Sequence, residues 1–246
     1  VQLSSVCRRW RSIVVGAPLF WNFFVSSSLS TIELAPLFFE RSKSLPIDLI
    51  VAYFSSDKLS PLLSSEIGRI QSLDFRSIQL DELIDCLSIF SVNSATNLTQ
   101  LKIRCSPKLG WHCYSSQEHY PLIKSAESLR SLVLKGVCSR LSPPMVNLTH
   151  LEIHGFSPTF TEFRSLFTSN PALSTLCLPR FLPTKWLDDE YCPIDAFSLR
   201  SFSVGLAMHW GPGTCNCMLT FLRMDNLEYL EIVGHPAGSI SNHFSS

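Results

Sequence analysis

A short pattern, Leu-x-x-Leu-x-Leu, recurs along the chain and limits what the chain can fold into. Two of its clearest copies read LTHLEI (148–153) and LEYLEI (227–232). Further copies in the same frame lie at residues 70–75, 98–103, 129–134, 173–178 and 199–204. Because the copies recur at intervals of roughly 20–30 residues, the pattern indicates a fold built from stacked units of similar structure.

Each copy of the pattern is expected to form a strand. Alternate side chains of a strand share one face, so Leu151 and Ile153 are expected to point inward, whereas His150, Glu152 and His154 point outward. One unit cannot bury its own apolar face, but stacked units bury a continuous core. The sequence therefore predicts an α/β fold. It is an irregular leucine-rich-repeat solenoid, with a parallel sheet on its concave face and helices and loops on its convex face.

The segments around these copies differ in their apolar spacing. Between copies, apolar residues at helical spacing predict helices over residues 80–90, 159–169 and 214–224. The other spacers, residues 105–121, 135–147 and 179–196, are expected to be loops. Before the repeats, the same criterion predicts helices over residues 1–16, 29–43 and 57–67, with a strand over residues 47–54.

Composition argues against several classes of partner and compartment. The net charge is zero, from 20 basic and 20 acidic residues, which argues against nucleic acid as a partner. No apolar run reaches the ~18 residues that a membrane helix needs, so no membrane association is expected. The nine cysteines imply no disulfide framework and favour a cytoplasmic or nuclear setting. The chain begins with Val rather than Met, so we expect a fragment of a longer protein.

Residues capable of catalysis or metal binding form no recognisable pattern. The Cys and His residues at 112–113 and 215–217 lack the paired Cys-x2–4-Cys units of a zinc site. Cys177, with His150 or His154 one repeat away, is the one nucleophile and base that a hydrolase alternative would use. We therefore expect a non-enzymatic protein with no catalytic residue, no metal site and no cofactor.

Residues 6–25, VCRRWRSIVVGAPLFWNFFV, combine an Arg-rich helix with a turn that contains Pro and Trp. The string resembles the C-terminal half of an F-box, in which a Val-Cys-Arg-x-Trp-Arg helix is followed by a Pro-x-Leu/Phe-Trp turn. The matching residues are Val6, Cys7, Arg8, Trp10, Arg11, Pro18 and Trp21. With repeats following it, the chain is similar to F-box/leucine-rich-repeat proteins of the fungal type.

This resemblance implies a function and a division of the chain. The function is that of a substrate-recognition subunit of an SCF-type (cullin) ubiquitin ligase. The partners would be a Skp-type adaptor, bound through the F-box, and an unknown target protein, bound through the repeats. The implied division is residues 1–25 (C-terminal half of the F-box), 26–66 (junction) and 67–246 (solenoid). The alternative is a repeat scaffold without a ligase role, in which the F-box remnant only caps the solenoid.

Two sets of residues are the candidate functional surfaces. In the F-box part, the apolar stripe of Val6, Trp10 and Ile13 and the turn at 19–21 are expected to close the F-box core and its junction with the repeats. On the repeats, the outward positions include Asp74 and Val133. The candidate binding residues are Arg76, Lys102, Arg104, Lys135, His150, Glu152 and His154. Because the basic ones lie in the N-terminal rows, we hypothesise that this face selects an acidic or phosphorylated segment.

Overall fold

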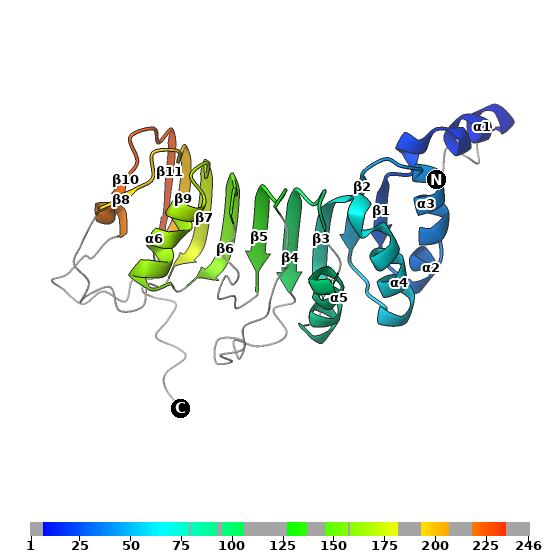
Figure 1. The fold of residues 1–246 in the computed structure, drawn as a ribbon, viewed down its shortest axis with the longest axis horizontal. Coiled ribbons are helices and arrows are strands. Elements are labelled where there is room, and N and C mark those ends of the chain that lie inside the picture. Colours follow the sequence, from blue (N-terminus) through cyan, green and yellow to red (C-terminus); the bar gives the residue numbers. More distant parts are fainter. Residues whose placement is uncertain are drawn as a thin grey trace. The chain divides into compact units, whose positions relative to one another are not determined.

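The structure of the chain is a computed structural model. It describes residues 7–78, 80–92, 95–105, 127–136, 146–156, 158–181, 193–206 and 218–234. The chain divides into two compact units, residues 1–129 and residues 130–246. It is an α/β protein whose main parallel pairing joins nine described strands, four in the first unit and five in the second (Figure 1).

The four strands of the first unit lie side by side in chain order, and each pairs in parallel with the next. They are β1 (Phe23–Ser26), β2 (Ile47–Val51), β3 (Ile70–Ile78) and β4 (Gln100–Cys105). The helices of this unit are α1 (Arg8–Gly16), α2 (Leu29–Ile32), α3 (Ala35–Ser42), α4 (Ser56–Glu66) and α5 (Leu80–Val92), with the 3-10 turns η2 (Pro18–Phe20) and η3 (Ile67–Arg69).

The second unit has the same parallel arrangement, in the order β5, β6, β7, β9 and β11. These strands are β5 (Ser131–Lys135), β6 (His150–Phe156), β7 (Thr175–Phe181), β9 (Ser201–Leu206) and β11 (Tyr229–Gly234). Two short strands, β8 (Ile194–Asp195) and β10 (Leu222–Arg223), form a separate parallel pair. The described helical segments are α6 (Phe160–Ser169) and the 3-10 turn η6 (Met218–Phe221).

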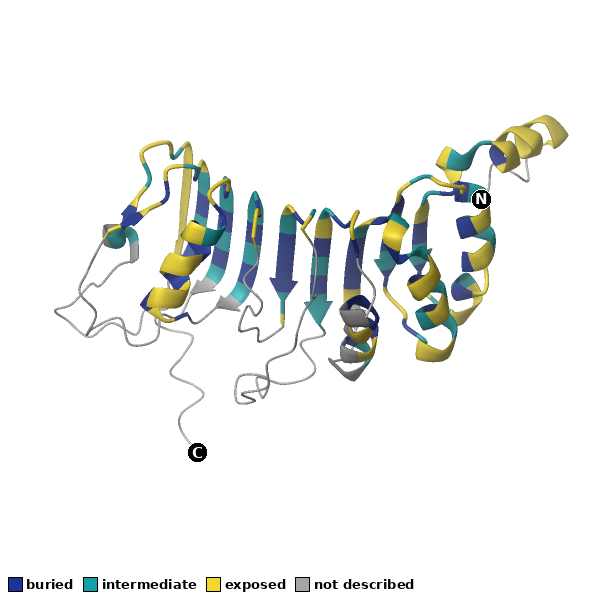
Figure 2. Ribbon diagram, viewed as in Figure 1, coloured by how far each residue is buried: buried dark blue, intermediate teal, exposed yellow. Residues whose placement is uncertain are grey.

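Alternation along the strands places the core on one face of each sheet (Figure 2). In β2, Ile47, Leu49 and Val51 are at most 1% exposed, whereas Asp48 and Ile50 between them are partly exposed. Helices also contribute to this core, as where Phe39 of α3 packs edge-to-face on Phe24 of β1. Full burial of one such side chain contributes about 1.5–3 kcal/mol, so the alternating pattern is the main stabilising term of the sheets.

The structure confirms the strands that the repeated pattern predicts, because each of its seven copies contains or overlaps a strand in a parallel sheet. The strand expected over residues 47–54 is also present, as β2. However, β1 was not anticipated. It lies in the aromatic stretch after the first helix and pairs with β2, although its sequence FFVS does not match the Leu frame.

The expected helices agree with the structure over residues 57–67, 80–90 and 159–169, and differ elsewhere. Within the described part of the chain, the first helix begins at Arg8. Residues 29–43 form two helices, because Pro36 is the second residue of α3 and cannot continue the helix before it. The helix expected over residues 214–224 is wrong for the described residues, which form η6 and β10 instead. The loop expected over residues 179–196 contains the end of β7 and β8, and most of the expected loops lie outside the described residues.

Helix α6 shows how the local sequence sets an element's start. The Thr159 hydroxyl accepts a hydrogen bond from the Glu162 backbone N–H at 3.2 Å, and the Glu162 carboxylate accepts one from the Thr159 N–H at 2.8 Å. Such a reciprocal cap satisfies two donors that the first turn leaves unpaired. The helix then buries Phe160, Phe163, Leu166 and Phe167, as its spacing predicts.

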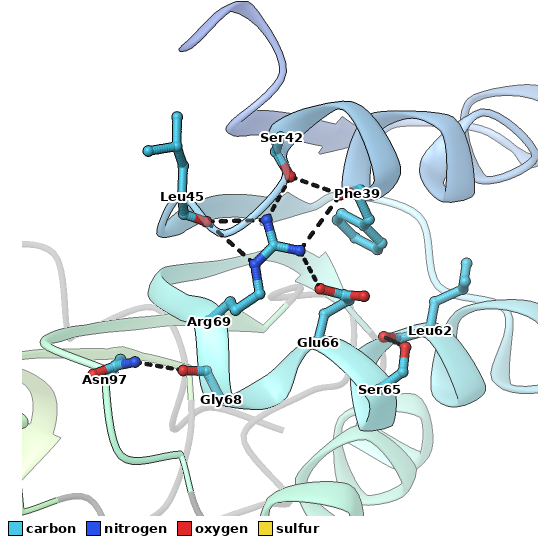
Figure 3. Close-up of polar contacts among 9 residues, drawn as sticks. All are labelled: Phe39, Ser42, Leu45, Leu62, Ser65, Glu66, Gly68, Arg69 and Asn97. Atoms are coloured by element: carbon cyan, nitrogen blue, oxygen red, sulfur yellow. Dashed lines mark hydrogen bonds and ion pairs between the residues drawn. The ribbon is translucent and has the colours of Figure 1, made fainter. Parts of the chain in front are cut away.

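Arg69 connects the end of α3 to the turn that leads into β3 (Figure 3). Its guanidinium donates to the Leu45 carbonyl at 3.1 Å, to the Ser42 hydroxyl at 2.7 Å and to the Glu66 carboxylate at 2.6 Å. Ser42 is fully buried and donates in turn to the Phe39 carbonyl. The planar five-donor guanidinium suits this site, because it satisfies several acceptors that lie in different directions.

A β-bulge in the second unit brings two strand backbones unusually close. The register of β7 and β9 shifts between Leu178 and Phe181, where Pro179 lies within the strand. Gly205 of β9 is buried opposite this bulge. A Cβ at position 205 would lie only 2.5 Å from the Pro179 carbonyl carbon and would overlap its oxygen. Glycine is therefore needed here for close backbone approach.

We expect Gly205→Ala to lower the free energy of unfolding by about 2–3 kcal/mol, because the bulge must move to accommodate the methyl group. Urea unfolding followed by circular dichroism measures this difference. Gly68→Ala is the matched control, since a Cβ at position 68 meets no atom within 4 Å. Equal effects of the two substitutions would contradict the close approach at Gly205.

Candidate functional site

In the part of the chain that the structure describes, the outward residues of the strands in each unit gather on the face opposite the core, in rows set by the register. We call this face the open face. In the first unit, Asp48, Ser72 and Gln100 form one row across β2, β3 and β4. The next row is Ile50, Asp74 and Lys102, and Arg76 lies opposite Arg104 one row further on. The register therefore groups three predicted binding residues, Arg76, Lys102 and Arg104.

These residues surround a buried carboxylate, and we call Asp74, Arg76, Lys102 and Arg104 the Asp74 cluster. Arg76 Nε donates to Asp74 Oδ2 at 2.9 Å, and Arg104 Nη1 lies 3.5 Å from the same oxygen. Asp74 is only 6% exposed. Its other oxygen, Oδ1, is buried and accepts no hydrogen bond from the described part of the chain. The cluster thus contains three cations around one carboxylate.

The Asp74 cluster borders a hollow of about 340 Å³ on the open face. Its lining includes Asp74, Arg76 and Lys102, together with Asp48 at the opposite end and Phe23 of β1. The side chain of Phe23 is half exposed. The hollow therefore offers charged groups of both signs, polar groups and one aromatic ring to a ligand.

Asp74 and Val133 occupy outward positions of their strands, as expected, but neither is exposed. Both are buried, at 6% and 4% exposure. Asp74 is covered because long arginine side chains from its own strand and from β4 converge on it. Alternation predicts the face correctly but not how neighbouring side chains cover it. An acidic residue flanked by Arg at i+2 and by basic residues on the next strand was the available signal.

The second unit contains a different group on its open face, which we call the Glu152 cluster: Lys135, Glu152 and His154. Lys135 Nζ lies 2.8 Å from Glu152 Oε1, and His154 Nε2 lies 2.7 Å from the same atom. Glu152 thus neutralises the one predicted basic residue of this unit. His150 lies at the start of β6, one row before Glu152, opposite Ser131 and Thr175.

Cys177 lies on the same face but is not activated as a nucleophile. The register places it opposite Glu152 and Ser203, while the Ser203 hydroxyl donates to Glu231 at 2.6 Å. Burial and the two nearby carboxylates raise the pKa of the Cys177 thiol, despite a hydrogen bond with Ser203 and the charge of Lys135. The thiol therefore stays protonated at neutral pH, which disfavours the Cys–His hydrolase alternative.

Residues 6–25 are the segment that resembles an F-box, and we call them the F-box-like segment. Its described residues form one buried anchor and an exposed apolar surface. Trp21 is 3% exposed, and its Nε1–H donates to the Val14 carbonyl at 2.7 Å. Phe38 packs edge-to-face on the Trp21 ring, and the Arg41 guanidinium lies 4.5 Å from the ring centre. Trp21 therefore fixes the turn η2 against α1 and α3.

The expectation that the apolar stripe and turn close a core is wrong for most of the described residues. Trp10 and Ile13 are each 47% exposed, Leu19 is 73% exposed and Phe20 is 51% exposed. Trp21 is the buried member of the turn, and Val14, which follows Ile13 on α1, is also buried. The helical stripe predicts one apolar face of α1, but only its last turn packs against the unit. We call Trp10, Ile13, Leu19 and Phe20 the α1–η2 surface.

The remaining motif residues add little to this surface. Arg8 and Arg11 are exposed on α1, and Cys7 is its exposed N-cap residue. Pro18 begins η2, and Val6 lies outside the described residues. The Cys and His residues at 112–113 and 215–217 also lie outside them. Within the described ranges, no group of three or more His, Cys, Asp or Glu residues is placed to hold a metal ion. None of the helices in that part of the chain is long and apolar enough to cross a bilayer.

Comparisons with models of known protein families, with curated proteins and with solved structures find no match to this chain. What the chain does must therefore be inferred from its own surfaces. Three of these combine exposure with chemistry: the α1–η2 surface, the hollow beside the Asp74 cluster, and the open face around the Glu152 cluster.

The Glu152 cluster predicts a pH-dependent stability. Burial raises the pKa of Glu152, but hydrogen bonds and charges from Lys135 and His154 outweigh it, so the pKa lies below the usual 4.5. A lowered pKa stabilises the folded state above the unfolded-state value and loses this effect as pH falls through the folded-state value. We expect Glu152→Gln to cost about 1 kcal/mol at pH 7 and almost nothing near pH 3, measured by urea unfolding.

Glu228→Gln is the control for this prediction. Glu228 pairs with Arg200 at 2.8 Å, but both side chains are 66% exposed, so its loss should change stability by less than about 0.5 kcal/mol at either pH. A cost for Glu152→Gln that is equal at pH 7 and pH 3 would show that its ion pairs do not stabilise the fold.

The raised pKa of Cys177 predicts slow alkylation. With a pKa above 9.0, less than about 1% of the thiol is ionised at pH 7. We expect iodoacetamide to label Cys177 at least about tenfold more slowly than the exposed Cys7, measured by mass spectrometry of proteolytic peptides. Faster labelling at Cys177 than at Cys7 would revive the nucleophile alternative.

Proposed function

We propose that this chain is an irregular leucine-rich-repeat protein that works as a non-enzymatic interaction module. Its role is that of a substrate-recognition subunit of an SCF-type ubiquitin ligase, located in the cytoplasm or nucleus. A Skp-type adaptor binds the F-box-like segment, and the open faces of the sheets bind a target protein. Function here is positioning, so the protein needs no catalytic residue.

The observation that carries this proposal is the α1–η2 surface. Four large apolar side chains are about half exposed or more within eleven residues, at the segment that resembles an F-box. Contiguous exposed apolar side chains of this kind mark interaction sites on soluble proteins. The buried Trp21, held by Val14 and Arg41, keeps the turn in place and so presents Leu19 and Phe20 outward.

Equivalent backbone contacts between successive strands support the repeat part of the proposal. Each copy of the pattern contributes a strand, and neighbouring copies within a unit pair in parallel. The carbonyl of Arg130 accepts hydrogen bonds from Thr149 and His150 one copy later, and that of Thr149 accepts from Ser174 and Thr175 in the same way. Equivalent positions thus make equivalent contacts, as stacked repeats require.

A second function is favoured by a different observation. The strand β1 follows η2 directly and pairs with β2, and its Phe24 packs against Phe38 and Phe39. The F-box-like segment therefore contributes to the end of the first sheet. In this alternative the chain is a repeat scaffold without a ligase role, and the segment serves only as its cap.

Capture of a Skp-type adaptor by the purified chain distinguishes the two. We expect the double variant Trp10→Ala/Leu19→Ala to lose adaptor binding by at least about thirtyfold, because buried aromatic and aliphatic anchors dominate interface energies. Its unfolding free energy should change by less than about 1 kcal/mol, because both side chains are exposed.

The matched control is Tyr229→Ala/Leu230→Ala on β11, which removes a similarly exposed aromatic and aliphatic pair from the second unit. This control should retain adaptor binding. Failure of the wild-type chain to capture the adaptor, or equal binding by both double variants, would favour the scaffold function.

A further inference from the structure

We propose that the hollow beside the Asp74 cluster binds an extended peptide segment of the target protein through one of that segment's carboxylate side chains. This inference deepens the proposed function, on which it rests, by naming the site and the chemistry that the open face selects. It depends on three observations: the charge of the cluster, the unpaired oxygen of Asp74, and the order of charges along the hollow.

The first observation is the excess of cations at one end of the hollow. Arg76 and Arg104 share one oxygen of Asp74, and neither of their side chains is covered, at 46% and 37% exposure. Arg76 contacts Asp74 through Nε, which leaves its two terminal nitrogens for another acceptor. Lys102 lies beside Asp74 in the register and forms no ion pair with any residue that the structure describes. A second carboxylate would therefore find donors already held in place.

The second observation is Asp74 Oδ1. This side chain is about nine-tenths buried and lines the hollow, yet its Oδ1 atom accepts no hydrogen bond within the described ranges. A buried acceptor without a donor is costly, and a ligand that supplies a donor removes that cost. A peptide has such donors in its backbone N–H groups, whereas a fully deprotonated anion such as sulfate or chloride has none. The site therefore favours a peptide that carries an anion.

The third observation is the order of charges along the hollow. Asp48 lies one row before Asp74, and Arg76 and Arg104 lie one row beyond it. Ser72 and Gln100 provide neutral polar groups in the same row as Asp48. The carboxylates of Asp74 and Asp48 offset part of the charge of Arg76, Arg104 and Lys102, so the cationic excess is small. A single ligand carboxylate matches this excess better than a dianionic phosphate does. Charge complementarity thus selects a carboxylate as the anion.

Ion pairs in the second unit favour a location of the proposed site on the first unit. Lys135, the predicted basic residue of that unit, is already paired with Glu152 at 2.8 Å. Arg200 is paired with Glu228 at the same distance. The hypothesis of a basic surface that extends over Lys135 is therefore replaced by a local site on the first unit.

The test is binding of a fluorescein-labelled oligoglutamate peptide to the purified chain at low salt, followed by fluorescence anisotropy. We expect Arg76→Gln/Arg104→Gln to weaken binding at least about tenfold. Because this variant removes both arginine contacts of Asp74, Lys102→Gln is a second variant that keeps them, and it should weaken binding about threefold to fivefold. Circular dichroism verifies that each variant is folded.

The control variant is Lys58→Gln/Arg200→Gln, which removes the same two charges from exposed ion pairs elsewhere. It should bind oligoglutamate as the wild type does. Equal weakening by this control would show binding to net charge alone and would overturn the inference. So would the absence of binding to wild type, or equal binding of an oligoglutamine peptide.

A phosphoserine peptide of equal charge separates the two sources of anion. Preference for it over oligoglutamate would overturn the assignment to carboxylates in favour of a phosphorylated target. The assay contains neither adaptor nor target protein, so its failure alongside intact adaptor capture refutes this site and leaves the proposed function standing. Loss of adaptor capture with retained peptide binding refutes the proposed function and leaves this site standing.

Discussion

Register between parallel strands is the constraint on which the rest of this structure depends. In the second unit, single carbonyl groups at the start of each strand, such as those of Ser174 and Arg200, accept two N–H groups from the next copy. These bonds align equivalent positions across the sheet. A slip of one residue would turn every Leu of a strand toward the open face and every charged residue toward the core. Core burial and the positions of the charged side chains are therefore fixed together.

The same register decides which charges meet. Asp74 lies beside Lys102, and Arg76 lies opposite Arg104, so cations collect around one carboxylate in the first unit. In the second unit Glu152 accepts both Lys135 and His154. The numbers of basic and acidic residues are equal overall, but the charges are paired differently on the open face of each unit. A binding site can therefore exist on a protein with no net charge, because only the local sum acts at contact distance.

Sequence periodicity predicted the strands well and their surroundings poorly. The Leu frame located seven strands because inward apolar positions are a necessary condition for burying one face. It missed β1, since Phe23, Phe24 and Val25 have no such frame and form a strand only by pairing with β2. Helical spacing, the second criterion, misplaced a helix at residues 214–224. Met218, Phe221 and Leu222 fit that spacing, but the described residues form a 3-10 turn and a strand. Pairing partners are tertiary information, which local spacing does not contain.

The candidate sites, too, follow only in part from the sequence pattern. The identity of Arg76, Lys102 and Arg104 as outward residues follows from alternation, but the burial of Asp74 beneath two arginines does not. Likewise, the helical stripe of α1 marks Trp10 and Ile13 as one face, but not whether anything packs on it.

The last strand, β11, shows the opposite case, in which the apolar pattern is present but the side chains are exposed. Leu230 and Ile232 of β11 occupy the same frame as Phe202 and Val204 of β9, with which they pair. The β9 residues are fully buried, whereas Leu230 and Ile232 are 46% and 50% exposed. An apolar pattern thus specifies which face a strand offers to the core. Whether that face is buried depends on the elements that pack against it, so function at such surfaces has to be argued from exposure and not from the pattern.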